Sequence, residues 1–216
     1  MSVPELTQTQ SKLVPNPVFA RLASDAQIER AAQALKANGI EVFVAANGQE
    51  ARNLLFQLIP AGAEVFTSAS ATLDALGIPE EVNRRYHSVR ARLADMDPQT
   101  QRREMVKLGA TPEWMVGSVH AVTEDGTVVI ASRTGSQLAG YAAGAEHVVW
   151  VVGAQKIVPN LDEAFRRVRE YSLALEDERA LKAYGVNSQI SKWLIVHQEF
   201  LPGRTTMIIV KENLGF

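Results

Sequence analysis

The sequence of 216 residues contains no cysteine. That absence excludes a disulfide framework, a thiolate zinc site, an iron–sulfur cluster held by this chain and a cysteine nucleophile. A surplus of charge is also missing, because the formal net charge is -2 and the isoelectric point is about 6.1. Without a basic surplus there is no global attraction to nucleic acid or to an anionic membrane, so we expect neither as a partner.

Long apolar runs are the third absence. The longest, Val148 to Val152, is far shorter than the ~20 residues of a membrane-spanning helix and is typical of a buried strand. The first residues, MSVPELTQTQSKLVPNP, have no apolar stretch behind a basic start, which argues against a secretory signal. We therefore expect a cytoplasmic protein with no membrane span.

What is present is the composition of a folded protein, with 46% hydrophobic and 21% charged residues. The first half alternates strand and helix signals. Helices are expected after Ser24, Asn47 and Ser70, each a good N-cap residue, with strands at 40–45 and 63–67. This β-α-β-α order predicts a parallel sheet covered by helices.

The second half has a different pattern. Residues 79–109 are helical and charged, with a break at Asp97-Pro98. Asp125-Gly126 predicts a tight hairpin between strands at 115–123 and 127–131. A strand buried on both faces is expected at residues 147–153, and an amphipathic helix at 161–184. Two closing strands are expected at 192–197 and 205–211.

These elements predict one mixed α/β domain, with a mainly parallel sheet and an inserted antiparallel hairpin. Residues 1–19 are polar and proline-containing, and are predicted to form a flexible N-terminal arm. Residues 20–216 are then the domain itself. A homodimer is expected from the general frequency of two-fold assemblies.

The run from residue 123 to 165 carries a resemblance to a known family. It reads TEDGTVVIASRTGSQLAGYAAGAEHVVWVVGAQKIVPNLDEAF: an acidic-glycine hairpin, a polar loop, an apolar strand and a G-x-x-K-I-V-P corner before a helix. In these features the chain resembles the LUD-domain proteins of the lactate-utilisation protein C type. The runs NGQEARNLLFQLIPAGAEVFTSASATLDALGI and GRTTMIIVKENLGF are similar to the family more loosely.

The resemblance implies the three-layer α/β/α fold shared by CoA transferases, ribose-5-phosphate isomerase and 5-formyltetrahydrofolate cyclo-ligase. It also implies an accessory role in the oxidation of L-lactate to pyruvate, beside an iron–sulfur partner subunit. Because this chain has no cysteine, we expect no cofactor in it, and any iron–sulfur cluster has to sit on the partner.

Glu124 is the candidate catalytic residue. Thr123-Glu124-Asp125-Gly126 looks like the Ser-Glu-Asn-Gly stretch that carries the nucleophilic glutamate in CoA transferases of this fold. A carboxylate in a cleft can attack an acyl-CoA and hold the acyl group as an anhydride. Here Asp125 replaces the asparagine and adds a like charge. The simpler interpretation is a solvated Glu beside an ordinary Asp-Gly turn.

The loop after the hairpin is the preferred binding site for a small anion. Arg133 can hold a carboxylate or phosphate through two parallel hydrogen bonds, while Thr134 and Ser136 offer neutral donors. Gly135 allows close approach of the backbone. The spacing matches neither a phosphate loop nor a dinucleotide fingerprint, and the alternative is an ordinary polar loop.

Three further residues complete the candidate ligand site. Ser68 and Ser70 follow a predicted strand, where the ligand crevice of an open α/β sheet lies, although Ser70 is equally explained as an N-cap. Lys156 follows the buried strand at a proline corner, where it either balances an anion or caps the strand end at the surface.

Other chemistry is poorly supported by the sequence. The four histidines show none of the spacings of a metal site, and no G-x-S-x-G elbow suggests a serine hydrolase, so no metal is expected. The basic stretch from Arg84 to Lys107 either contacts an acidic partner or a CoA phosphate, or is a solvated helical face.

Three hypotheses remain open: an accessory subunit of lactate oxidation, an acyl- or phospho-ligand enzyme that uses Glu124, and a small-ligand-binding module without turnover.

Overall fold

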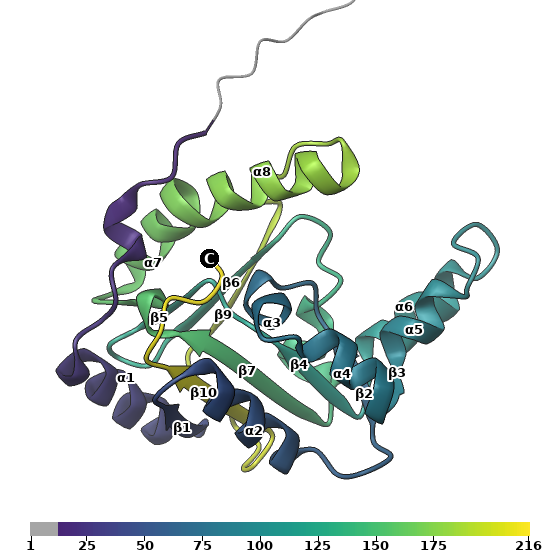
Figure 1. Cartoon of the computed structure of the whole chain (residues 1–216), viewed down its shortest axis with the longest axis horizontal. Coiled ribbons are helices and arrows are strands. Elements are labelled where there is room, and N and C mark those ends of the chain that lie inside the picture. Colours follow the sequence, from purple (N-terminus) through teal and green to yellow (C-terminus); the bar gives the residue numbers. More distant parts are fainter. Residues whose placement is uncertain (1–12) are drawn as a thin grey trace, which may run out of the picture.

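The computed structural model describes residues 13–216 and contains two β-sheets with helices on their outer faces (Figure 1). The larger sheet has six strands in the order β1-β10-β7-β4-β2-β3, and all neighbouring pairs are parallel. In that order the strands are β1 (Glu41–Ala45), β10 (Thr205–Val210), β7 (His147–Gly153), β4 (Trp114–Gly117), β2 (Glu64–Thr67) and β3 (His87–Ser88).

Alternate side chains of the central strands enter two separate cores. Val149 and Val151 of β7 join the core under the helices that follow β1 and β2, whereas Trp150 and Val152 join the core on the opposite face. This explains why β7 reads as a continuous apolar run, since both of its faces are covered. The helices of the first face are α2 (Gly48–Leu58), α3 (Ala71–Ala75) and α4 (Ile78–Arg85).

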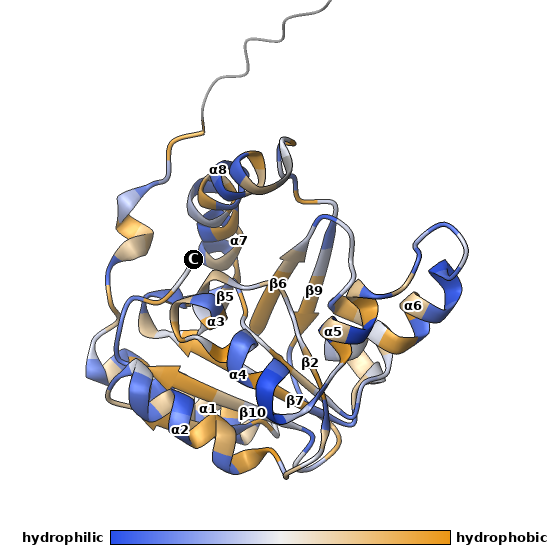
Figure 2. Cartoon of the chain, turned by 45° about the vertical axis from the view of Figure 1, so that its right-hand side comes forward, coloured by the Kyte–Doolittle hydropathy of each residue, from blue (hydrophilic) through white to orange (hydrophobic). Residues whose placement is uncertain are grey.

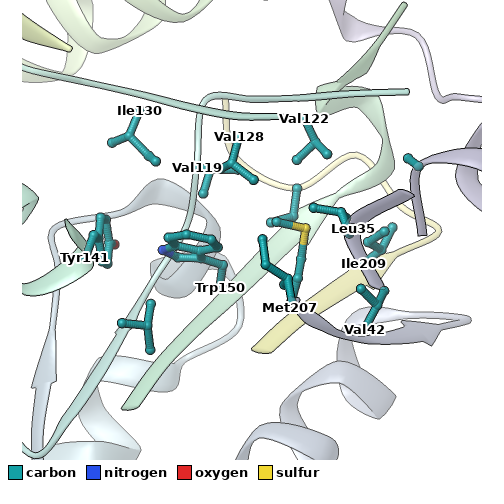
Figure 3. Packing of buried hydrophobic residues seen from close by; sticks show 14 of the residues in the cluster. Leu35, Val42, Val119, Val122, Val128, Ile130, Tyr141, Trp150, Met207 and Ile209 are labelled. Atoms are coloured by element: carbon teal, nitrogen blue, oxygen red, sulfur yellow. The ribbon is translucent and has the colours of Figure 1, made fainter. Parts of the chain in front are cut away.

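The opposite face is covered by α1 (Asp25–Ala37) and by a second, smaller sheet. That sheet has the order β8-β5-β6-β9, with bounds Ile157–Val158, Ala121–Thr123, Val128–Ser132 and Lys192–Val196. Figure 3 shows Trp150 and Met207 from the large sheet packed between Val119, Val122, Val128 and Ile130 on one side and Leu35 on another.

The small sheet is covered on its outer face by the long C-terminal helical run, which lies above it in Figure 1. That run consists of α7 (Leu161–Arg167), one π-helical turn η4 (Val168–Ser172) and α8 (Leu173–Tyr184). The short helix η1 (Pro17–Ala20) places Phe19 in the same core. The large sheet lies between α2, α3 and α4 on one face and α1 with the small sheet on the other, which confirms the predicted three-layer α/β class with a mainly parallel sheet and an antiparallel hairpin. Figure 2 shows the strands as mostly hydrophobic and the exposed helix faces as hydrophilic.

One predicted strand was wrong in its extent. Residues 115–123 were expected to be a single arm of the hairpin, but they form two strands, β4 in the large sheet and β5 in the small one. Only β5 pairs with β6 in the antiparallel hairpin. The apolar and small residues alternate smoothly across the break, so the pattern carries no sign that the chain passes from one sheet to the other.

The predicted helix starts are confirmed by their hydrogen bonds. Ser24 and Gln27 form a capping box at α1, and the Asn47 side chain accepts from the backbone N–H of Glu50 at α2. The charged middle segment is confirmed as helical but contains β3, α5 (Val89–Ala94) and α6 (Arg102–Ala110). Most of the predicted arm, residues 1–12, lies outside the described residues. In the described part of the chain, no helix has the length and apolar character needed to cross a membrane.

Candidate functional site

A pocket of about 650 Å³ lies where the carboxyl ends of three neighbouring parallel strands meet the small sheet. Ser68 follows β2, Ser118 follows β4, and Lys156 lies three residues beyond β7, on the short helix η3 (Ala154–Lys156). Because β7, β4 and β2 are adjacent in the sheet, these residues share one wall. The opposite wall comes from the loop after β6 and from η4 and α8.

Most of the sequence-predicted ligand residues are brought together at this pocket. Six of the seven line it: Ser68, Ser70, Arg133, Thr134, Ser136 and Lys156. Gly135, the seventh, shapes the loop instead, with a φ of 87° that other residues rarely adopt. Its α-carbon faces Lys192, whose Cδ lies 2.8 Å from the position of an added Cβ.

The loop after β6 is held by its own side chains. The Ser132 hydroxyl accepts from the Gly135 N–H at 2.9 Å and donates to Gln137 Oε1 at 3.0 Å. Thr134 Oγ1 accepts from the Ser136 N–H at 3.3 Å. Arg133 is exposed at the pocket and forms no salt bridge with any residue of the described chain. Its guanidinium is therefore available to an anionic ligand.

A buried hydroxyl pair forms the next part of the wall. The hydroxyls of Ser68 and Tyr141 lie 2.8 Å apart, and Tyr141 also packs edge-on against Trp150. Burial raises the pKa of Tyr141 to about 12, so it is a neutral hydrogen-bond donor at physiological pH. Gly117 makes room for this pair, because an added Cβ would lie 1.6 Å from the Tyr141 hydroxyl oxygen.

Tyr141 is positioned by an irregular helix. It lies on the π-helical segment η2 (Gly140–Gly144), and the second π-helical segment, η4, supplies Val168 and Ser172 to the opposite wall. Single π turns of this kind occur frequently at functional sites. Arg204 anchors the first segment by donating to the carbonyls of Gly140 and Tyr141.

Lys156 is buried in the pocket wall, with 1% of its surface exposed. The expectation that it caps a strand end at the surface was therefore wrong; η3 turns the chain back into the domain before β8. Its Nζ lies 3.0 Å from Thr72 Oγ1 and 3.1 Å from Ser118 Oγ. Burial, and then the nearby charge of Arg167, hold the pKa of the Lys156 amine well below its ordinary value.

Arg167 is fully buried behind the pocket wall. It donates to the carbonyls of Gln155 and His120 and, at 3.0 Å, to the Ser172 hydroxyl, while its Nη2 has no partner within the described chain. Burial lowers its pKa to about 10, so the guanidinium stays protonated at neutral pH. In residues 13–216, neither Arg167 nor Lys156 has a carboxylate partner.

His120 is the neutral member of this group. Its Nδ1 accepts from the Ala131 N–H at 3.2 Å, so Nε2 carries the hydrogen. Burial, with the charges of Lys156 and Arg167, lowers the pKa of His120 to about 3. The lining as a whole is cationic, with four basic side chains and one acidic one, Glu176, which is paired with Arg179.

Glu124, the candidate nucleophile, is placed apart from the other predicted residues. It does not line the pocket but accepts from Gln27 Nε2 at 2.9 Å and from Arg30 Nε at 2.7 Å, on the far side of the small sheet's hairpin. These bonds lower the pKa of its carboxyl, the Gln27 bond most. The neighbouring Asp125 side chain holds the turn by accepting from Thr123 and from the Thr127 N–H.

Among the site residues that sequence reasoning missed are His120, Tyr141 and Arg167. A signal existed only for Arg167. It lies between Ala164 and Tyr171 at helical spacing, on the apolar face of the predicted helix, where a charged residue is rarely placed without a purpose. His120 and Tyr141 reach the pocket through the crossing between sheets and the π turn, neither of which has a local signature.

Comparison with known proteins agrees with this architecture. The family model for the LUD domain matches residues 28–210. A DUF162 family protein from Deinococcus radiodurans has a similar fold, with a TM-score of 0.54 and 11% identity over 88% of this chain and 99% of that chain. Ribose 5-phosphate isomerase from Plasmodium falciparum is a weaker match, with a TM-score of 0.33 and 9% identity over 73% of this chain and 79% of that chain. No curated protein matches the sequence.

Proposed function

This chain belongs to the LUD domain family, and we propose that it binds a small organic anion in the pocket between its two sheets, as an accessory subunit in the oxidation of L-lactate to pyruvate. A carboxylate such as lactate or pyruvate is the expected ligand. The lining of the pocket supports the binding of an anion, and the resemblance to lactate-utilisation proteins supports the pathway.

The observation that carries the proposal is the absence of a carboxylate partner, within residues 13–216, for the two buried basic side chains Lys156 and Arg167. Burying a charge without a partner costs several kcal/mol in general, and folded proteins rarely retain such a cost without a use. A ligand carboxylate in the pocket would lie beside Lys156 and would supply negative charge to the region in front of Arg167. Arg133 and the hydroxyls of Ser68 and Ser136 stand on the pocket walls to orient it.

The electron-transfer step belongs to a partner in this proposal. An iron–sulfur cluster needs thiolate ligands, and this chain has no cysteine, so its residues do not fit such a cluster. The cluster would lie on the partner subunit named by the resemblance, in the cytoplasm.

The alternative enzyme, a CoA transferase that uses Glu124, would need that carboxylate beside a bound acyl group. Its pairing with Arg30 and Gln27, away from the pocket, favours ligand binding over acyl transfer. A non-catalytic binding module remains the simpler version of the same proposal, because it uses the same pocket. Recovery of an acyl adduct on Glu124 after incubation with acyl-CoA would support the enzyme instead.

The direct test is ligand binding to the purified chain. Thermal unfolding is followed with lactate, pyruvate, acetyl-CoA and ribose 5-phosphate, since a ligand of the native state raises the melting temperature with its concentration. For Arg133→Ala we expect about tenfold weaker binding of the active anion and an unchanged melting temperature without ligand, because the side chain is exposed. Arg103→Ala, which removes an exposed arginine from α6, is the charge-matched control.

Two outcomes would contradict the proposal: no anion shifts the unfolding temperature, or both arginine variants bind as well as the parent. The partner is tested separately, by purifying the tagged chain from its native cells and measuring iron and acid-labile sulfide. Recovery without any iron-containing protein would remove the accessory role while leaving ligand binding intact.

A further inference from the structure

The amine of Lys156 has an unusual hydrogen-bond environment for a lysine. Thr72 Oγ1 donates to the Leu214 carbonyl at 3.1 Å, so it can only accept from Nζ. Ser118 Oγ is the other neighbour, at 3.1 Å, and no further partner lies within the described residues. A protonated ammonium has three hydrogens to donate, whereas this site offers two hydroxyls and no carboxylate.

A neutral amine suits these neighbours better. It donates one hydrogen to Thr72, and its lone pair either accepts from the Ser118 hydroxyl or points to the open volume of the pocket, which both Lys156 and Ser118 line. A buried lysine next to a second cation is a known route to a nucleophilic amine at neutral pH. The second cation here is Arg167.

We infer that Lys156 is a nucleophile, which condenses through Nζ with the carbonyl carbon of a 2-oxo carboxylic acid held in this pocket. The inference rests on the proposed function, because it names the class of anion and adds a covalent step to its binding. The carboxylate of the acid would be held by the cationic walls, and its adjacent carbonyl would face the amine.

The step balances without an added reagent. The nitrogen lone pair attacks the carbonyl carbon, and one N–H proton moves to the oxygen to give a carbinolamine. The second N–H hydrogen and the hydroxyl then leave as water, and a C=N bond remains. His120, neutral with its hydrogen on Nε2, and the Ser118 hydroxyl are the pocket groups able to pass these protons. No oxidation takes place, so no redox cofactor is required.

Reductive trapping tests the inference on the unmodified full chain. The protein is incubated at neutral pH with pyruvate and sodium cyanoborohydride, digested, and mapped by tandem mass spectrometry. We expect one stable adduct on Lys156, heavier than lysine by the mass of pyruvic acid less one oxygen atom. Lys156→Arg should abolish it, whereas Lys36→Arg, at an exposed lysine of α1 away from the pocket, should leave it unchanged.

Binding is measured in parallel by thermal shift with pyruvate and with lactate, which has no carbonyl carbon to attack. If pyruvate shifts the unfolding temperature but no adduct forms on Lys156, the covalent step is overturned and the proposed binding function stands. Adducts spread over exposed lysines at equal yield would overturn it as well. If no carboxylate binds at all, both proposals fall together.

Discussion

At the scale of single residues, three basic groups in or directly behind the pocket wall differ in how burial changes their pKa. Arg167 keeps its charge, with a pKa of about 10, whereas His120 is held neutral and the pKa of Lys156 is well below its ordinary value. The three are coupled, since Arg167 disfavours protonation of both neighbours. Besides Lys156, the positive charge around the pocket comes from arginines, with Arg133 and Arg90 on its walls and Arg167 behind one of them.

His120 predicts a specific loss of stability in acid. Its pKa is about 3 in the folded chain against 6.5 for an ordinary histidine, so between these values the unfolded state binds more protons. Stability should therefore fall as the pH drops from 6.5 towards 3, by at most about 1.4 kcal/mol per pH unit from this group. His120→Asn, which can still accept from the Ala131 N–H, should flatten this part of the profile.

The measurement is urea unfolding of parent and variant at pH 7 and pH 4.5. His87→Asn, at an exposed histidine, is the matched control and should follow the parent. Identical pH dependence in parent and His120→Asn would mean that His120 is protonated in the fold.

Gly117 predicts a steric effect on the buried hydroxyl pair. An added Cβ would lie 1.6 Å from the Tyr141 hydroxyl oxygen and 2.5 Å from Ser68 Oγ, so Gly117→Ala should cost about 1–3 kcal/mol by overpacking and should impair ligand binding. Gly109 lies within helix α6, and the atom nearest to its added Cβ is 3.7 Å away. Gly109→Ala is therefore expected to stabilise the fold by about 0.8–1 kcal/mol through the higher helix propensity of alanine. Urea unfolding that ranks the two variants equally would contradict the close contact.

At the scale of elements, the hairpin turn between β5 and β6 also fixes helix α1. Gly126 has a φ of 82°, and an added Cβ would lie 2.8 Å from the α1 backbone at Leu35 N and 2.7 Å from Asn38 Nδ2. Asn38 donates from that same nitrogen to the Asp125 carbonyl at 3.1 Å. The turn is therefore a packing contact between sheet and helix as well as a reversal of the chain.

Gly126→Ala is expected to destabilise the fold by more than its backbone strain. Strain in the left-handed region costs roughly 1–2 kcal/mol, and the contact with α1 adds an overpacking cost of similar size. Gly62→Ala isolates the strain, because Gly62 has a φ of 77° and open space around it. Equal losses of unfolding free energy in the two variants would show that α1 yields to the added methyl group.

The elements also show what the sequence could predict. N-caps and the Asp-Gly turn are local, and Ser24, Asn47, Ser70 and Gly126 all act where they were expected. The division of residues 115–123 between two sheets was not predictable, because strand partners lie far along the chain: β4 pairs with β2 and β7, and β5 with β6 and β8. For the same reason the polar loop at Arg133 could be located from the local sequence, whereas the burial of Lys156 could not.

At the scale of the whole molecule, the two sheets and the C-terminal helices enclose a cationic pocket. Without a ligand, the fold would be more stable if the buried basic groups of this pocket were replaced by apolar ones. Lys156→Met fills the same space with an apolar side chain. When the amine is removed, the Thr72 hydroxyl still donates its hydrogen bond to the Leu214 carbonyl. We expect the variant to be about 0.5–2 kcal/mol more stable than the parent at pH 7, in the absence of ligand, and to lose affinity for pyruvate.

The pH dependence of that gain separates a charge effect from a packing effect. The folded pKa of Lys156 is lowered, so below the ordinary value of 10.5 the unfolded state binds more protons, and parent stability rises with pH up to that value. The advantage of Lys156→Met should therefore shrink between pH 7 and pH 9.5 in urea unfolding, while Lys192→Met, at an exposed site, shows no such trend. A variant that is less stable at both pH values would mean that the hydroxyl contacts of Lys156 outweigh its desolvation. A gain that shrinks with pH would show that the fold carries this amine at a stability cost, which is the condition expected of a group retained for binding and reaction.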